Sequence, residues 1–250
     1  MGTETLGHIG AYIRPSAVLF DLDDTIVSYD IAGRHAWDEI CAEYYKGLGF
    51  DSAAEFRTLI DGSREWYWSD AGRFLKGRLD LRSARREIVS DAFTRSGRSG
   101  EIKAFEIADR FTARHEELIH PFPGTTAVLE AIRCAGVRMG MLTNGASDRQ
   151  NGKIDRFGLR DYFEFCLVEG DLGFGKPDRR MFMKALELLD LEASEVWMVG
   201  DNPDLDIFPA NELGIFSIWV DRGNWSREKA VQARPGRMIG SLSELKDMMT

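Results

Sequence analysis

The sequence predicts an α/β fold, a doubly wound, Rossmann-like parallel sheet with an inserted, all-helical second part. Five short apolar runs are mostly continuous rather than alternating, which is typical of strands buried on both faces of a parallel sheet. Helical patterns separate the last four runs, and this spacing favours strand–helix units. Between the first two runs, residues 33–119 show helical periodicity and almost no strand signal. The five runs are 17–20, 137–143, 163–168, 196–200 and 215–220.

Local signals place the helices between these runs. Thr125 is a candidate N-cap for the helix before the second run, and Gly136 a candidate stop. Pro177 opens a stretch with a helical apolar stripe. The end of the sequence predicts a short strand and a last helix, which Ser241 or Ser243 would cap.

The helical stretch after the first run predicts a division of the chain into two parts. Gly- and Ser-containing joints separate its helices, and "HPFPG" at residues 120–124 returns the chain to the sheet. We therefore expect a core domain of residues 1–30 and 120–250 and a helical cap domain of residues 31–119. The first fifteen residues lack the basic and long apolar regions of a secretory signal, so we expect a loose arm there.

Composition limits the classes of partner. The chain has 250 residues, of which 44% are apolar and 29% charged, as in a globular protein. Its net charge of −9 makes it a poor general binder of nucleic acid or of an anionic membrane. Its three cysteines include no C-x-x-C pair, and we expect reduced, buried thiols. Reduced thiols favour a cytoplasmic protein, which we expect to be a monomer or homodimer.

Charged and polar residues follow four of the predicted strands. Sites in open α/β sheets form beyond the carboxyl ends of the strands, so these residues should converge. Converging carboxylates repel one another unless a cation lies among them, and Mg²⁺ is a natural choice for oxygen ligands. One carboxylate would remain as a nucleophile. The residues are Asp21 and Asp23, Thr143 to Gly145, Lys176, and Asp201, Asp204 and Asp206.

Four motifs occur in the order and spacing of the haloacid dehalogenase-like superfamily, and the chain resembles its phosphohydrolases. The motifs are "DLDDT", "LTNG", "GKP" and "GDNPDLD". The helical insert resembles that family's C1-type cap. The sequence from the second motif onward is most similar to that of the subgroup of pyrimidine nucleotidases and N-acylneuraminate-9-phosphatases. The resemblance implies a Mg²⁺-dependent phosphatase that acts on a small phosphorylated metabolite, either a sugar phosphate or a nucleoside monophosphate.

The resemblance also implies catalytic roles. Asp21 would attack phosphorus and form an aspartyl-phosphate. Asp23 would protonate the leaving alkoxide and then activate water. Thr143 and the backbone N–H groups near Asn144 and Gly145 would hold the phosphoryl oxygens.

The remaining motif residues would balance charge. Lys176 would neutralise the nucleophile and the transferring phosphoryl group. Asp201 would bind Mg²⁺ together with Asp21 and the backbone carbonyl of Asp23. Asp206 would support the metal or its waters, or orient Lys176.

Several alternatives remain open at this point. Asp23 favours phosphoryl transfer over dehalogenation, because a halide needs no proton on leaving. A phosphonatase would need a cap lysine that reaches the site, and Lys46, Lys76 and Lys103 are candidates by residue type only. A phosphomutase of the β-phosphoglucomutase kind would use the same motifs, and a non-catalytic binding protein could share the fold.

Residues 63–86 of the cap are locally basic and include adjacent aromatic residues. We expect most of these side chains to lie on solvated or core faces and one or two to face the cleft. Asp24 is expected to face solvent or stabilise the turn after the first strand, and Thr25 to hold that turn through a local hydrogen bond. Asp204 is expected to be a helix N-terminal charge.

Overall fold

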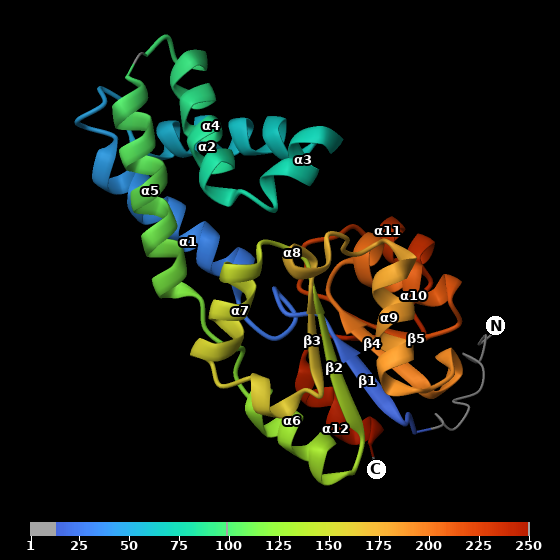
Figure 1. The fold of residues 1–250 in the computed structure, drawn as a ribbon. Helices are drawn as coiled ribbons and strands as arrows, with labels where there is room; N and C mark the ends of the chain where they lie inside the picture. Colours follow the sequence, from blue (N-terminus) through green and yellow to red (C-terminus); the bar gives the residue numbers. More distant parts are fainter. Residues whose placement is uncertain (1–13, 99, 250) are drawn as a thin grey trace, which may run out of the picture.

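The structure, a computed structural model, describes residues 14–98 and 100–249 (Figure 1). The expected loose arm therefore falls largely outside the described residues. Six parallel strands form one sheet in the order β3-β2-β1-β4-β5-β6, which confirms the predicted α/β class. The strands are β1 (Ala17–Phe20), β2 (Arg138–Thr143), β3 (Phe165–Val168), β4 (Val196–Gly200), β5 (Phe216–Val220) and β6 (Arg237–Ile239).

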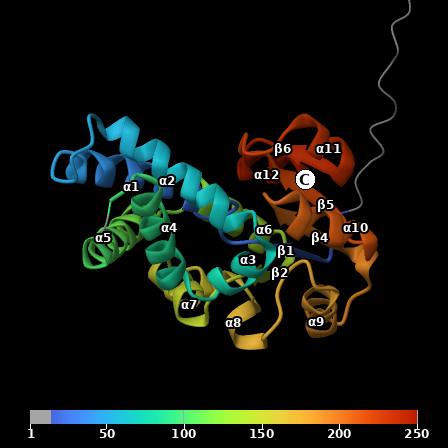
Figure 2. The same ribbon diagram turned by 90° about the horizontal axis from the view of Figure 1, so that it is seen from above.

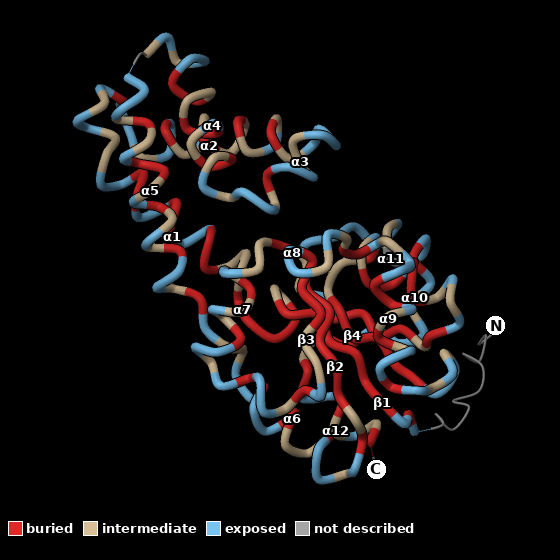
Figure 3. Tube along the Cα trace, viewed as in Figure 1, coloured by how far each residue is buried: buried red, intermediate tan, exposed pale blue. Residues whose placement is uncertain are grey.

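The central strand β1 is buried on both faces, because its side chains alternate between two apolar clusters. Val18 and Phe20 join the cluster that includes residues of α6, α7 and α12. Ala17 and Leu19 join the cluster that includes residues of α9 and α10. Figure 3 shows the buried strands between partly exposed helices. These helices are α6 (Thr125–Cys134), α7 (Ser147–Arg156), α8 (Glu169–Leu172), α9 (Arg179–Leu189), α10 (Phe208–Glu212), α11 (Arg227–Ala233) and α12 (Leu245–Met248).

Among the described residues, five helices form the cap between β1 and α6, and all of them except the short α3 share an apolar cluster around Trp37 and Phe56. Side chains of Ser52, Asp70 and Asp80 cap three of them by accepting backbone N–H groups. The views in Figures 1 and 2 show the cap as a separate helical layer beside the sheet, linked to it through α1 and α5. The helices are α1 (Tyr29–Tyr44), α2 (Ala53–Trp68), α3 (Ala71–Gly77), α4 (Leu81–Arg95) and α5 (Glu101–Leu118).

Two local expectations about capping have different outcomes. Thr125 is not the N-cap of α6; that position is held by Gly124 with φ of 82°, and Thr125 is the first helical residue. A positive φ suits glycine, which carries no β-carbon. Ser241 does cap the turn before α12, by accepting the backbone N–H of Ser243.

The expectation of buried thiols is only partly correct. Cys41 is buried, Cys166 is half-buried and Cys134 is exposed. Cys134 lies on the outer side of α6, where its thiol contacts Glu130. Among the described residues, no helix is both long and apolar enough to cross a membrane.

Candidate active site

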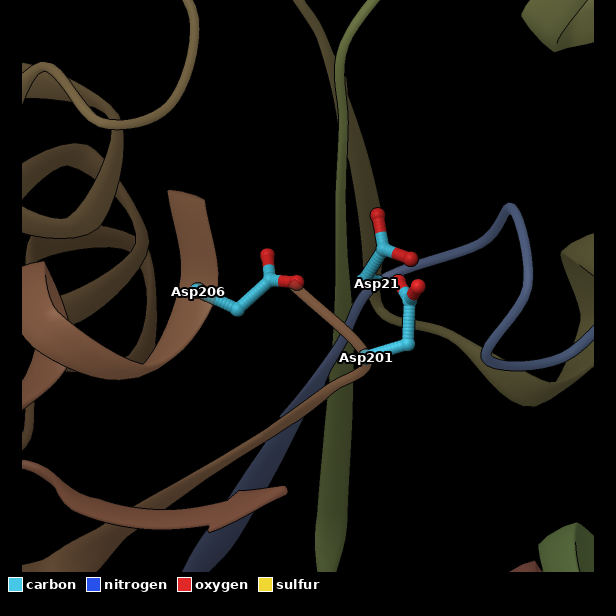
Figure 4. Close-up of side chains that lie close together, drawn as sticks. All are labelled: Asp21, Asp201 and Asp206. Atoms are coloured by element: carbon cyan, nitrogen blue, oxygen red, sulfur yellow. The ribbon is translucent and has the colours of Figure 1, made fainter. Parts of the chain in front are cut away.

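Three aspartates meet at the carboxyl end of the sheet. Asp21 follows β1, Asp201 follows β4, and Asp206 lies in the π-helical turn η3 (Pro203–Ile207). One carboxylate oxygen from each lies within 4.8 Å of the others, and Figure 4 shows the three side chains approaching from separate segments. Gly200 permits the approach of Asp206, because a β-carbon at Gly200 would lie 2.4 Å from the Asp206 carboxyl carbon. The predicted convergence of these residues is thus observed.

The cluster carries unfavourable negative charge. Burial raises the pKa of Asp21 to about 7; Lys176 opposes this shift, and Asp206 adds to it. Burial also raises the pKa of Asp201 well above its ordinary range, and repulsion from Asp21 contributes. Both shifts favour the neutral carboxyl. A divalent cation among these oxygens would reverse that preference.

Lys176 is the cation that the structure places at the cluster. Its ammonium group is buried and donates to Asp21 Oδ1 and to Asp206 Oδ1, both at 2.6 Å. Burial disfavours the charged form of Lys176, but Asp206 and Asp21 outweigh burial and raise its pKa. The second oxygen of Asp206 accepts the backbone N–H of Asn202 at 3.0 Å. Asp206 is therefore well placed to orient the lysine.

The Asp23 carboxylate is held by the core helix α7 instead of by this cluster. Lys153 Nζ lies 2.5 and 2.6 Å from its two oxygens, and Gln150 Nε2 donates to Oδ2 at 3.0 Å. Neither residue was predicted for the site. The only signal in the sequence is their spacing of three residues, which puts both on one face of α7.

The loop after Asp23 is a tight turn, and one of its two predicted hydrogen-bonding roles is wrong. Asp24 adopts φ of 61° and accepts the backbone N–H of Asp30 at 2.7 Å, so it stabilises the turn as expected. Burial raises the pKa of Asp24 to about 7. The expected local hydrogen bond of Thr25 is wrong, because its buried hydroxyl has no partner among the described residues. Arg222 holds the turn instead, by donating to the backbone carbonyls of Asp24 and Thr25.

Residues at the end of β2 contact their neighbours through both side chain and backbone. Thr143 Oγ1 accepts Gln150 Nε2 at 2.5 Å. The Asn144 side chain donates to the Lys176 carbonyl at 2.7 Å and accepts the Lys176 backbone N–H at 2.8 Å. Asn144 thereby fixes the backbone that carries the buried lysine, which is a positioning role.

The backbone N–H of Gly145 donates to Glu169 Oε2 at 3.0 Å. Glu169 is buried and forms an ion pair with the cap residue Arg78, with 2.5 Å between Nη2 and Oε1. A chain of contacts therefore runs from the cap through Glu169 to the loop after β2. Sequence reasoning did not single out Glu169, and nothing in its local sequence marks it.

A cavity of about 250 Å³ lies between the cap and this edge of the core. Its core side includes Asp23, Asn144 and Gly145, and its cap side includes Trp37 and residues of the basic stretch. We expected one or two of the basic and aromatic side chains of that stretch to face the cleft, and the structure places four there: Arg64, Trp68, Arg78 and Arg85. His35, two residues before Trp37 on α1, is exposed. Asp204 also lies away from the cluster, in the first turn of η3, where it pairs with Lys229 at 2.7 Å.

Comparison with known proteins agrees with this geometry. The family model described as haloacid dehalogenase-like hydrolase matches residues 15–214. The chain belongs to this hydrolase family. Within it the chain groups with enzymes named as phosphatases.

Two relatives match over nearly their whole length. The phosphoserine phosphatase of Thermus thermophilus is 35% identical, over 91% of this chain and 96% of its own. The ribulose-1,5-bisphosphate 5-phosphatase of Halopiger xanaduensis is 32% identical, over 94% and 99%. The pyrimidine 5'-nucleotidase YjjG of Escherichia coli is 32% identical over 58% of this chain and 63% of its own. The predicted family resemblance is confirmed.

Solved structures confirm the fold. The HAD hydrolase YfnB of Bacillus subtilis, in a magnesium-bound form, has a TM-score of 0.69 at 21% identity, with 95% of this chain and 100% of that chain covered. A 2-haloacid dehalogenase from Pseudomonas syringae has a TM-score of 0.59 at 28% identity, over 93% and 97%.

Proposed function

We propose that this chain is a Mg²⁺-dependent phosphomonoester hydrolase that works through an aspartyl-phosphate on Asp21. The observation that carries the proposal is the buried contact of Lys176 with Asp21 and Asp206, next to Asp201. The cap cavity adjoins the same loop, because Asp23 lines it. Such an arrangement supplies a nucleophile together with a compensating positive charge.

The donor set fits a magnesium ion. All three groups of the cluster are carboxylates, and the raised pKa values of Asp21 and Asp201 reflect burial and repulsion that a hard cation would relieve. We assign Asp21 and Asp201 as side-chain ligands, with the Asp23 carbonyl as a third. Asp206 takes a supporting role, because its two oxygens already accept Lys176 and Asn202. When bound, the ion supplies positive charge to the carboxylates and the phosphoryl oxygens.

The chain's own residues can perform both chemical steps. An Asp21 oxygen forms a bond to phosphorus while the ester P–O bond breaks, and Asp23 gives its proton to the departing alkoxide. Asp23 then takes a proton from water, whose oxygen attacks phosphorus and breaks the bond to Asp21. Inorganic phosphate leaves and Asp21 is restored. Lys176, Thr143 and the N–H groups of the loop after β2 stabilise the phosphoryl charge.

The Asp23 side chain must release one carboxylate oxygen to the leaving group during this cycle, while the other keeps a partner on α7. In the structure it accepts from Lys153 and Gln150. Both belong to α7, so they hold the carboxylate at the rim of the cavity, beside the place where a leaving group would lie. The Gly145 N–H must likewise leave Glu169 to contact phosphate.

The cavity size favours a small substrate. Its volume of about 250 Å³ lies below the roughly 300–1,000 Å³ typical of pockets for drug-sized ligands. A sugar phosphate or similar small ester therefore fits better than a nucleoside monophosphate. Two of the named relatives are phosphatases for phosphoserine and ribulose 1,5-bisphosphate, which agrees with this size, whereas the third is a pyrimidine 5'-nucleotidase.

We also propose that residues 31–119 close as a cap over a core of residues 1–30 and 120–250, in a cytoplasmic enzyme. Closure would exclude water from the first step. The apolar clusters of the cap and of the core share no buried residue, and Leu118, at one end of the cap, packs against both.

The test is phosphate release from small phosphate esters, measured with Mg²⁺ and with chelator, for the wild type and Asp21→Asn. We expect metal-dependent release that Asp21→Asn abolishes. Asp204→Asn is the matched control, because Asp204 is an exposed carboxylate paired with Lys229. Isomerised product without free phosphate would indicate a phosphomutase. No turnover of any ester would indicate a non-catalytic protein.

A further inference from the structure

The cavity adjoins the place where the leaving group of the proposed reaction must lie. Asp23, which would protonate that group, forms part of its wall, as do Asn144 and Gly145. Most of the rest of the wall comes from the cap, which supplies apolar side chains such as Trp37 and Ile88 together with basic ones. The residues of this wall therefore indicate which chemical groups the leaving group of the substrate carries.

Arg85 is an unusual member of the wall, because it is a buried cation that contacts only neutral groups. Its guanidinium donates to Thr112 Oγ1 at 3.0 Å and to the Tyr29 hydroxyl at 3.4 Å, and lies 2.8 Å from His115 Nδ1. Burial lowers the pKa of His115 to about 3, so this imidazole is neutral and its Nδ1 accepts from Arg85. Only 5% of the surface of Arg85 is exposed. A buried guanidinium without a counter-charge is costly.

The other charged side chains of the wall all have partners of opposite charge. The acidic groups near the cavity are already paired with other cations, so they do not compensate the positive charge of Arg85. The pairs are Asp23 with Lys153, Asp30 with Arg34, Arg64 with Asp61, and Arg78 with Glu169. Glu116, on the far side of Arg85, pairs with Arg149 at 2.5 Å. Among the described residues, no carboxylate forms an ion pair with Arg85.

We propose that the cavity receives a leaving group bearing a second anionic group, a carboxylate or a second phosphoryl group, and that Arg85 binds it. The inference rests on the proposed function and names its substrate class. The substrate would supply the counter-charge that the protein does not. Trp37, stacked on Phe111 with 3.8 Å between ring centroids, would contact the short carbon skeleton between the two anions.

The experiment uses pairs of esters that differ only in the second anion. The pairs are 3-phosphoglycerate with glycerol 3-phosphate, and propane-1,3-diol bisphosphate with its monophosphate. We expect the wild type to prefer the member with the second anionic group in at least one pair, and that pair identifies carboxylate or phosphoryl. In Arg85→Met we expect kcat/KM to fall about 100-fold for the preferred member and only about threefold for the counterpart that lacks the second anionic group. Arg85→Lys should restore part of the preference.

The matched control is Arg82→Met, on the same helix. Arg82 is exposed and paired with Asp109, so this variant removes the same charge outside the cavity and should change kcat/KM by less than about twofold. Equal loss on both members of each pair in Arg85→Met would show a structural role and overturn the proposal. So would a wild type without preference for either anion.

A binding measurement separates this inference from the proposed function. Calorimetry on Asp21→Asn, with Arg85 intact and replaced, compares the affinities for the same ester pairs without turnover. We expect the ester with the second anionic group to bind more tightly than its counterpart only when Arg85 is present. Absence of hydrolysis in the wild type would contradict the proposed function, while these affinities would still decide whether Arg85 selects the anion.

Discussion

The ammonium nitrogen of Lys153 lies 2.5 and 2.6 Å from the two carboxylate oxygens of Asp23. Asp23 belongs to the loop after β1 and Lys153 to α7, 130 residues later. Lys153 also lies over the Tyr29 ring, 4.7 Å from its centroid. The side chain proposed as acid and base is thus fixed by a residue outside the four motifs.

Replacing Lys153 should therefore impair chemistry more than folding. In Lys153→Met the Asp23 carboxylate keeps only Gln150, so its position is less defined. We expect kcat for an alkyl phosphate to fall about 10- to 100-fold, within the range of general acid–base effects, with a smaller change in KM. Steady-state kinetics and thermal unfolding measure the two effects. Lys184→Met, at a surface pair with Glu187, is the control. A kcat within about twofold of wild type would contradict a positioning role.

The sequence predicted where the motif residues lie, because their location follows from the topology of the sheet. Asp21, Lys176, Asp201 and Asp206 lie on segments that follow parallel strands, and such segments meet at one edge of the sheet. Continuous apolar runs located five of the six strands, with small shifts at their ends. The sixth followed from a short apolar stretch near the end of the sequence.

The sequence did not predict the contacts that surround these motifs. Lys153 and Gln150 reach Asp23 only because α7 packs with one particular face toward the loop after β1. Which face of a helix packs against a sheet depends on tertiary contacts, so the local sequence does not determine it. Arg85 lies in a basic stretch whose seven Arg and Lys residues look alike, and burial distinguishes it only in the folded cap. Thr25 was expected to form a local bond, but its turn is held by Arg222 from a distant segment.

Metal binding should stabilise the fold through the aspartate cluster. Mg²⁺ at a hundredfold excess over its dissociation constant would add about 2.7 kcal/mol, or a rise in Tm of roughly 5–10 °C for a chain of this size. Asp201→Asn removes one proposed ligand and should abolish most of this rise. Asp204→Asn should keep it. Differential scanning calorimetry with Mg²⁺ and with chelator makes the comparison. A rise that persists undiminished in Asp201→Asn would place the metal elsewhere.

His115 should make the protein sensitive to mild acid. Burial, aided by Arg85, lowers its pKa in the folded state to about 3, against an ordinary value near 6.5. Below pH 6.5 the unfolded chain therefore binds a proton that the folded chain does not. Stability should fall as pH decreases from about 6.5 toward 3, by up to about 1.4 kcal/mol per pH unit from this group. Above pH 6.5 the group contributes no pH dependence.

The variant His115→Asn isolates this contribution, because Asn does not titrate. We expect its free energy of unfolding, measured in urea, to fall less steeply between pH 6.5 and 4 than that of the wild type. His35→Asn, at an exposed position, is the control and should leave the slope unchanged. Equal slopes for His115→Asn and the wild type would show that this imidazole is protonated normally in the fold.

The ion pair between Arg78 and Glu169 should hold the cap against the core. Only 15% of the Arg78 side chain and 5% of the Glu169 side chain are exposed, and Glu169 also accepts the Gly145 N–H. Breaking a buried pair by removing one partner typically costs about 3–5 kcal/mol. In Arg78→Met we expect a more open cap, seen as a larger radius of gyration in small-angle scattering, and a KM about tenfold higher. Lys76→Met is the control, since Lys76 pairs with Glu87 at 3.9 Å on the surface.

A double-mutant cycle tests whether this pair acts as a unit. If Arg78 and Glu169 stabilise closure through each other, Arg78→Met and Glu169→Gln should have similar effects on KM. The double variant should then be little worse than either single one, because the second change removes a partner that is already lost. Fully additive effects would show instead that the two side chains act separately, Arg78 on the substrate and Glu169 on the loop after β2.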